Sequence, residues 1–260
     1  TDPDADRLGI GIKDDYGKYI TLNGNQIMIV LTEYLLSKNK NDLNQSYFIG
    51  STVVSTPMIK NLAKAYNVDL KIGLTGFKWI AKMINDYPNQ KFIGGGEESY
   101  GYLVGDFVRD KDAITSSLLA CELGSECKSN GESLYDYLIK CYIKYGFFKE
   151  RLVSVEKKGI KGLSEIKDIM IGLRNKPINT LAGTEVILIQ DFEKSEQLNL
   201  KTGLKSVLEF PKSNVLIFES KDGTRVASRP SGTEAKITFD LSVNMKRKQK
   251  KMFKIANKMK

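Results

Sequence analysis

Between residues 25 and 94 the spacing of apolar residues alternates between two patterns, and this alternation limits the possible folds more than any other feature of the sequence. Apolar residues three or four positions apart predict helices, and short apolar runs between them predict buried strands. Strands separated by single helices form a mainly parallel sheet, covered on both faces, with ligand-binding loops at the carboxyl ends of the strands. The expected elements are helix 27–35, strand 47–54, a helix from Pro57 through Tyr66, strand 68–74, helix 76–86, strand 91–94, and helices at about 112–127 and 133–145.

The pattern changes after Gly146. Strand-like segments now follow one another with few helices between them, which predicts an antiparallel α+β domain. The turn at residues 221–224, which contains Asp222 and Gly223, is typical of a β-hairpin. The expected strands are 147–155, 184–191, 207–210, 215–220, 225–228 and 236–243, with helices at about 163–173 and at the C-terminus.

The chain therefore divides into three expected parts. Residues 1–22 hold a hairpin around the turn 14–17 and would end a preceding domain. Residues 23–147 form the α/β domain with its doubly wound, mainly parallel sheet. Residues 148–260 form the antiparallel α+β domain that follows it.

The net charge of +9 suggests a nucleic-acid partner until the charges are located. Residues 244–260 contain eight Lys and Arg residues and no acid, so the rest of the chain has a net charge of only +1. Met252, Ile255, Ala256 and Met259 lie at helical spacing in this segment, which predicts a terminal helix with a solvated basic face. We therefore expect no nucleic-acid partner, although salt-sensitive binding through this helix would reveal one.

The remaining composition favours a cytoplasmic protein. No apolar run approaches the roughly 20 residues of a membrane span, so no membrane association is expected. The three cysteines form no CxxC pair and are expected to be reduced, and the absence of histidine disfavours zinc. The first residues, TDPDADR, have neither an initiator methionine nor a signal peptide, and the sequence there looks cut.

The same opening segment places Asp2, Asp4 and Asp6 at alternate positions, with Arg7 directly after them. Carboxylates at this spacing can converge on one hard cation, and Mg²⁺ prefers a few such oxygens together with water or phosphate. An EF-hand would require glycine and glutamate where this chain has Arg7 and Lys13. An acidic surface turn without a metal remains an alternative.

Three glycines, Gly94 to Gly96, precede Glu97, Glu98 and Ser99 at the end of a predicted strand. Glycines allow a ligand to approach the backbone closely, and paired carboxylates with a hydroxyl can bind the vicinal hydroxyls of a sugar. We expect Glu97 to face solvent on this loop. A flexible turn with solvated acids is the alternative, and the G-x-G-x-x-G spacing of a dinucleotide site is absent.

The segment Arg229-Pro230-Ser231-Gly232-Thr233 follows the predicted hairpin strand and combines a guanidinium, two hydroxyls and a glycine. Such a turn can hold a phosphate, and Arg225, four residues earlier on the same strand face, can add a second positive charge. An ordinary loop stabilised by its own hydroxyls is the alternative. Lys78 begins a predicted helix, where an anion is favoured, but Lys82 and Asn85 share its helical face, so this position alone favours a solvated lysine.

Taken in order, TDPDADR, LTGFKW, GGGEESYGY and RPSGTEAKI resemble the landmarks of the α-D-phosphohexomutase family over the whole chain. The resemblance implies that Asp2, Asp4 and Asp6 bind Mg²⁺, with Arg7 beside the reacting group and Lys78 near the substrate. It also implies that Glu97 and Ser99 bind sugar hydroxyls. Arg229, Ser231, Gly232 and Thr233 would hold the phosphate that is not reacting.

The family's mechanism uses a phosphoserine and a sugar 1,6-bisphosphate intermediate, which also acts as activator. The serine loop of the type T-x-S-H-N-P has no counterpart in this chain, so the resemblance implies that the missing N-terminal domains of the same protein supply it and that the isolated chain is inactive. Ala235 replaces a common proline. GEES and GFKW favour a phosphoglucomutase, an isomerase of carbohydrate metabolism. A phosphomannomutase, a phosphopentomutase or a non-catalytic phosphosugar-binding module is the alternative.

Overall fold

The computed structural model describes residues 1–157, 161–232 and 234–245. Contacts within the chain group these residues into two compact units, residues 1–148 with Met245 and residues 149–244. The predicted C-terminal helix lies outside the described residues. Within the described residues, no helix combines the length and the apolar character that crossing a membrane requires.

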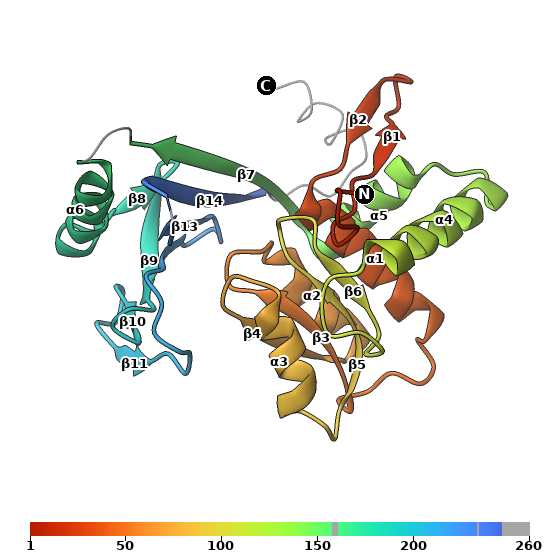
Figure 1. Ribbon diagram of the computed structural model, residues 1–260, viewed down its shortest axis with the longest axis horizontal. Helices are drawn as coiled ribbons and strands as arrows, with labels where there is room; N and C mark the ends of the chain where they lie inside the picture. Colours follow the sequence, from red (N-terminus) through yellow and green to blue (C-terminus); the bar gives the residue numbers. More distant parts are fainter. Residues whose placement is uncertain (158–160, 233, 246–260) are drawn as a thin grey trace. The chain divides into compact units, whose positions relative to one another are not determined.

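The centre of the first unit is a sheet with the strand order β4-β3-β5-β6 (Figure 1). Strands β4, β3 and β5 are parallel, and β6 is antiparallel to β5. The prediction of a mainly parallel α/β sheet is confirmed. The elements are α1 (Gly24–Lys38), β3 (Tyr47–Thr52), α2 (Met58–Tyr66), β4 (Asp69–Gly73), α3 (Lys78–Asp86), β5 (Lys91–Gly96), β6 (Tyr102–Val104), α4 (Ala113–Ser129) and α5 (Leu134–Tyr145).

Successive residues of β3 face opposite sides of this sheet, and both sides are covered. Phe48 packs among the apolar residues of α3, including Ile80, whereas Ile49 belongs to the larger core with α1, α2, α4 and α5. Both Phe48 and Ile49 are fully buried. Burial of both faces explains why adjacent residues of the central strand β3 are apolar, rather than alternating with polar ones.

Helix α1 begins with a capping box, in which Asn23 and Gln26 each accept a hydrogen bond from the other's backbone N–H at 2.9 Å. The helix is buried on nearly all sides because it contacts the sheet as well as α2, α4 and α5. Its one buried acid, Glu33, accepts hydrogen bonds from Tyr66 at 2.8 Å, Tyr145 at 3.0 Å and Tyr137. These phenols compensate for burial of the carboxylate and join α1 to α2 and α5.

The predicted N-terminal hairpin is present as β1 (Gly11–Lys13) and β2 (Tyr19–Thr21), which pair antiparallel. Its turn is closed by Asp14, whose Oδ1 accepts hydrogen bonds from the N–H groups of Tyr16 at 2.8 Å and Lys18 at 3.0 Å. Ile12 of this hairpin packs into the core of the first unit.

The second unit is an antiparallel sheet with one described helix, α6 (Gly162–Asn175), packed against its apolar face. The strand order is β11-β10-β9-β12-β13-β14-β7, with β8 paired to β9. The expected antiparallel α+β architecture is confirmed. The strands are β7 (Phe147–Glu156), β8 (Thr180–Leu181), β9 (Thr184–Asp191), β10 (Glu196–Asn199), β11 (Lys205–Val207), β12 (Leu216–Ser220), β13 (Arg225–Pro230) and β14 (Lys236–Met245).

One predicted strand of this unit is misplaced. We expected a strand at 207–210, but β11 ends at Val207, and the next residues leave the sheet so that Phe210 packs on Phe192 with ring centroids 5.3 Å apart. Strand β10 was not predicted, because its sequence Glu-Gln-Leu-Asn has almost no apolar residue. Pairing with β9 and β11 overrides this weak local preference.

Candidate active site

The three aspartates of the opening loop lie together. Asp2, Asp4 and Asp6 each offer one carboxylate oxygen, and these oxygens lie within 4.8 Å of one another. Oδ1 of Asp6 is buried and has no hydrogen-bond partner among the described residues. An orphaned carboxylate oxygen beside two others is a donor set that suits a hard divalent cation such as Mg²⁺.

The local backbone explains this convergence. Oδ1 of Asp2 accepts hydrogen bonds from the N–H groups of Asp6 at 3.1 Å and Arg7 at 3.0 Å, while Ala5 adopts a left-handed conformation with φ of 57°. The bond from the Arg7 N–H lowers the pKa of Asp2 below its ordinary value. Asp2 thus closes the loop with one oxygen and retains the other for a ligand.

The aspartate loop is joined to the loop that follows β5. The N–H of Leu8 donates to the carbonyl of Tyr100 at 3.2 Å, and Arg7 forms an antiparallel bridge with Gly101. On another side, the N–H of Ala113 at the start of α4 donates to the carbonyl of Ala5 at 3.0 Å. The first unit therefore brings the predicted metal loop and the predicted sugar loop into direct contact.

The glycines before the sugar loop have a different role from the one we expected. Gly94, Gly95 and Gly96 are the last residues of β5, and added side chains there would meet protein rather than a ligand. A Cβ on Gly95, for example, would lie 2.5 Å from the carbonyl oxygen of Gly50 on β3. These glycines allow close packing of neighbouring backbones.

Glu97 is buried, with 4% of its surface exposed, which corrects the expectation that it faces solvent. Its N–H donates to the carbonyl of Gly101 at 3.0 Å and closes the loop, in which Tyr100 has a left-handed φ of 74°. The Glu97 carboxylate makes no hydrogen bond or ion pair with another described residue. Ser99 lies two residues further along this strained loop and is half-buried.

Lys111 belongs to the same cluster, although the sequence did not single it out. Its Nζ lies 2.8 Å from Oδ2 of Asp6, and its side chain is only 13% exposed. Burial opposes the ammonium charge, but hydrogen bonds from Lys111 to Asp6 and Asp110 raise the pKa of Lys111 above its ordinary value. A Cβ on Gly101 would lie 2.6 Å from Cδ of Lys111 and 2.9 Å from Oε1 of Glu97, so both side chains line Gly101.

The only sequence signal for Lys111 is a cation between two acids in a polar loop, which is common on protein surfaces. A second residue that the sequence did not indicate is Thr75, whose Oγ1 is buried without a hydrogen-bond partner among the described residues.

Lys78, which was predicted, begins α3 as expected but is exposed, with its ammonium 5.4 Å from the ring centroid of Trp79. Lys78 makes no hydrogen bond or ion pair with the described residues of the aspartate loop or the sugar loop.

The predicted phosphate residues lie in the second unit. Arg225 and Arg229 are both in β13, four positions apart and therefore on one face, so Arg229 lies within the strand rather than following it. Arg225 lies opposite Glu219 of β12, with Nε 3.8 Å from Oε2, and burial lowers the pKa of Arg225. Nε of Arg229 lies 2.9 Å from Oδ2 of Asp240 on β14.

The turn after β13 continues this set. The N–H of Ser231 donates to the carbonyl of Lys236 at 2.7 Å, and the Ser231 hydroxyl accepts from the N–H of Glu234 at 3.2 Å. Gly232 is exposed, with open space around its Cα. Thr233 lies outside the described residues.

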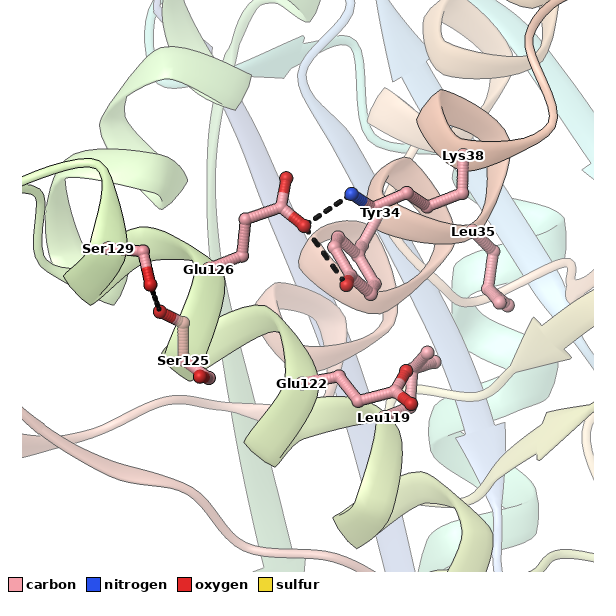
Figure 2. Close-up of a pocket in the computed structure, with 8 residues that line it drawn as sticks. All are labelled: Tyr34, Leu35, Lys38, Leu119, Glu122, Ser125, Glu126 and Ser129. Atoms are coloured by element: carbon pink, nitrogen blue, oxygen red, sulfur yellow. Dashed lines mark hydrogen bonds and ion pairs between the residues drawn. The ribbon is translucent and has the colours of Figure 1, made fainter.

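Figure 2 shows a separate pocket of about 610 Å³ between α1 and α4. Glu126 contacts the ammonium of Lys38 there and accepts a hydrogen bond from the hydroxyl of Tyr34 at 3.2 Å. Because Lys38 neutralises Glu126 and no predicted site residue lines the pocket, the joined loops are the stronger candidate site. The lining residues are Tyr34, Leu35, Lys38, Leu119, Glu122, Ser125, Glu126 and Ser129.

Comparison with known proteins identifies related sequences. Residues 23–145 match the family described as phosphoglucomutase/phosphomannomutase, alpha/beta/alpha domain III. A phosphoglucomutase of Staphylococcus epidermidis is 40% identical over 245 residues, which are 94% of this chain and 44% of the relative. A phosphoglucomutase of Staphylococcus aureus is 39% identical over 244 residues, with the same coverage of both chains. The chain thus spans less than half the length of these relatives.

Solved structures show the same fold at much lower identity. The open form of pp63/parafusin, a phosphoglucomutase from Paramecium, superimposes with a TM-score of 0.63 and 16% identity, covering 95% of this chain and 40% of that one. A phosphoglucomutase/phosphomannomutase family protein from Burkholderia thailandensis gives a TM-score of 0.55 and 14% identity, with coverage of 94% and 41%.

Proposed function

Because the chain belongs to the phosphoglucomutase/phosphomannomutase family of α-D-phosphohexomutases, we propose that it forms the sugar-binding and phosphate-binding part of a magnesium-dependent phosphoglucomutase. The full-length protein would interconvert glucose 1-phosphate and glucose 6-phosphate through a phosphoserine and glucose 1,6-bisphosphate. The phosphoserine would come from a part of the protein outside this chain. A cytoplasmic location fits this function.

One observation carries the proposal: the aspartate loop and the sugar loop are hydrogen-bonded to each other. The bond from Leu8 to Tyr100, at 3.2 Å, and the bridge between Arg7 and Gly101 hold three carboxylates beside Glu97. A mutase needs a cation site for the phosphoryl group in transfer next to a site for the sugar hydroxyl that receives it. In this proposal, the junction would supply both within one unit.

Asp2, Asp4 and Asp6 would hold Mg²⁺. The cation would neutralise charge that develops on the transferring phosphoryl group. Lys111 forms an ion pair with Asp6 at 2.8 Å and so limits the repulsion among the three carboxylates. Arg7, with Nε 3.7 Å from Oδ1 of Asp6, would contact an oxygen of the same phosphoryl group.

Glu97 and Ser99 would bind sugar hydroxyls. The Glu97 carboxylate is buried and makes no hydrogen bond or ion pair with another described residue, and an incoming hydroxyl would supply the missing hydrogen bond. A carboxylate that accepts from hydroxyls can bind a sugar in two orientations, because the ring presents vicinal hydroxyls in both. Lys78 would approach the substrate from the start of α3.

Arg229, Ser231, Gly232 and Thr233 would hold the phosphate that is not reacting, with Arg225 as a second charge on the same strand face. Nε of Arg229 donates to Asp240 at 2.9 Å, and the planar guanidinium group suits binding of a phosphate. The distant phosphate alternates between the 1- and 6-positions of the sugar. One clamp would therefore serve both substrates.

The test is a coupled assay on the full-length protein with Mg²⁺ and glucose 1,6-bisphosphate. We expect conversion of glucose 1-phosphate to glucose 6-phosphate, with a higher kcat/KM than for mannose 1-phosphate or ribose 1-phosphate. Preference for one of the other sugars would make the protein a phosphomannomutase or a phosphopentomutase. Absence of turnover with all three, despite binding of the phosphosugar, would leave only a binding module.

A further inference from the structure

The loop from Glu97 to Gly101 is held by a second acid that the proposed chemistry does not use. Strands β3 and β5 are parallel neighbours, so the residues that follow them meet at one edge of the sheet. Thr52 is the last residue of β3, Ser55 lies in the loop that follows it, and Glu98 follows β5. The hydroxyls of Thr52 and Ser55 each donate to Oε2 of Glu98 at 3.2 Å.

Both hydroxyls are deeply buried, with 2% of Thr52 and 3% of Ser55 exposed. They also lie 2.8 Å from each other. Each hydroxyl has one proton to donate, so the two hydroxyls can make at most two of these three hydrogen bonds at a time. An acceptor such as the Glu98 carboxylate allows both hydroxyls to donate. A buried hydroxyl pair without that acceptor would lose hydrogen bonds that water cannot replace.

The backbone of Glu98 is fixed as well. A Cβ on Gly24, the first residue of α1, would lie 2.2 Å from the carbonyl oxygen of Glu98, so only glycine allows the helix to approach the loop this closely. The start of α1 is itself tied to the loop after β3, because Oδ1 of Asn25 accepts from the N–H of Thr56 at 2.8 Å. Glu98 is thus held by its side chain and packed against α1 through its backbone.

This anchoring bears on the two flanking residues. Glu97 and Ser99 are covalent neighbours of Glu98. Tyr100 has a left-handed conformation, which costs free energy and persists only where the surrounding structure imposes it. A loop held at its second residue keeps Glu97 and Ser99 in one arrangement before the sugar binds. Such preorganisation increases affinity without a direct contact to the ligand.

Resting on the proposed function of this loop, we propose that Thr52 and Ser55 are positioning residues, which act through the Glu98 carboxylate to orient Glu97 and Ser99 toward the sugar. The inference assigns Glu98 itself a positioning role rather than contact with the substrate. Loss of both hydroxyls should raise the KM for the phosphosugar by about tenfold, since hydrogen bonds to charged groups are among the stronger ones.

The experiment compares Thr52→Val, Ser55→Ala, their double variant, Glu98→Gln and Glu98→Ala in the full-length protein. We expect the KM for glucose 1-phosphate to rise in all of them, least in Glu98→Gln, whose side-chain carbonyl still accepts. In the Glu98→Ala background, Thr52→Val should have no further effect on KM. Thr56→Val is the matched control, because Thr56 is equally buried and adjacent, but its hydroxyl accepts from the N–H of Met58 at 3.3 Å instead.

A second measurement separates this inference from the proposed function. Hydrogen exchange of the Glu97 amide, which donates to Gly101, should be faster in Thr52→Val and Ser55→Ala and unchanged in Thr56→Val. Faster exchange in a protein without turnover would reject the mutase function but keep the positioning role. Unchanged exchange and unchanged KM in an active enzyme would overturn the positioning role.

Discussion

Nε of Arg229 lies 2.9 Å from Oδ2 of Asp240, across the pair of strands β13 and β14. The Asp240 side chain is 8% exposed and that of Arg229 is 25% exposed, so the pair is largely shielded from water. Burial raises the pKa of Asp240, and the Arg229 charge counteracts this effect. Asp240 therefore orients the Arg229 guanidinium through its Nε edge.

We predict that Arg229→Ala weakens binding of glucose 1-phosphate and glucose 6-phosphate alike in the full-length protein. Loss of a charge-assisted contact should cost about 1.5 to 3 kcal/mol for each. Asp240→Asn should weaken both less, since the amide keeps one hydrogen bond to Arg229. Steady-state KM values in both directions provide the measurement.

The control for these variants is Asp191→Asn, which removes a comparably buried ion pair with Arg174 in the same unit. It should lower thermal stability and leave both KM values unchanged. Kinetics of Arg229→Ala that equal those of the parent would remove Arg229 from the phosphate site.

Glu97→Gln should reduce turnover while preserving or raising stability. Glu97 is buried and its carboxylate pairs with no other described residue, so the neutral amide removes a charge that burial disfavours. The same change removes the acceptor proposed for a sugar hydroxyl. Thermal unfolding tests the expected stability and kcat/KM tests the expected loss of turnover, both measured on one preparation. A large loss of stability with normal kinetics would show that Glu97 is structural.

Asp222, in the turn between β12 and β13, should make the second unit sensitive to acid. A hydrogen bond from the Ser220 hydroxyl, at 2.6 Å, lowers the pKa of Asp222 below its ordinary value of 3.8. A carboxyl group whose pKa is lower in the folded than in the unfolded protein stabilises the fold at pH values above its unfolded-state pKa. This contribution to the free energy of unfolding is lost as the pH falls through the folded-state pKa.

We therefore predict that the free energy of unfolding, measured with urea, decreases as the pH falls below about 4. Asp222→Asn should reduce this slope of unfolding free energy against pH. The control is Asp106→Asn, in an exposed loop outside this turn, which should leave the slope unchanged. Identical pH slopes for parent and Asp222→Asn would show that the turn carboxylate is not linked to stability.

The sequence predicted the architecture because the spacing of apolar residues along the chain reflects which residues are buried. Phe48 and Ile49 are adjacent and both apolar, which already implies a strand covered on two faces. Polar β10 and the segment after Val207 could not be predicted, because their structure depends on pairing and on the distant ring of Phe192. Local preference has little weight against such tertiary contacts.

The candidate site was only partly predictable for a similar reason. Asp2, Asp4 and Asp6 are close in sequence, so their convergence could be inferred from spacing alone. Lys111 could not be inferred, since its contact with Asp6 spans more than a hundred residues of chain. The burial of Glu97 and the hydroxyl pair on Glu98 likewise depend on how β3 and β5 end at one sheet edge.

The central claim is that the aspartate loop binds the metal of a phosphosugar mutase beside the sugar loop. Its most direct test is the turnover of glucose 1-phosphate by the full-length protein with Asp2, Asp4 and Asp6 all replaced by Asn, across a range of Mg²⁺ concentrations. We predict a fall in kcat of at least about a hundredfold that added Mg²⁺ does not reverse, with phosphosugar binding largely retained. Turnover equal to that of the parent at the same Mg²⁺ concentration would contradict the account.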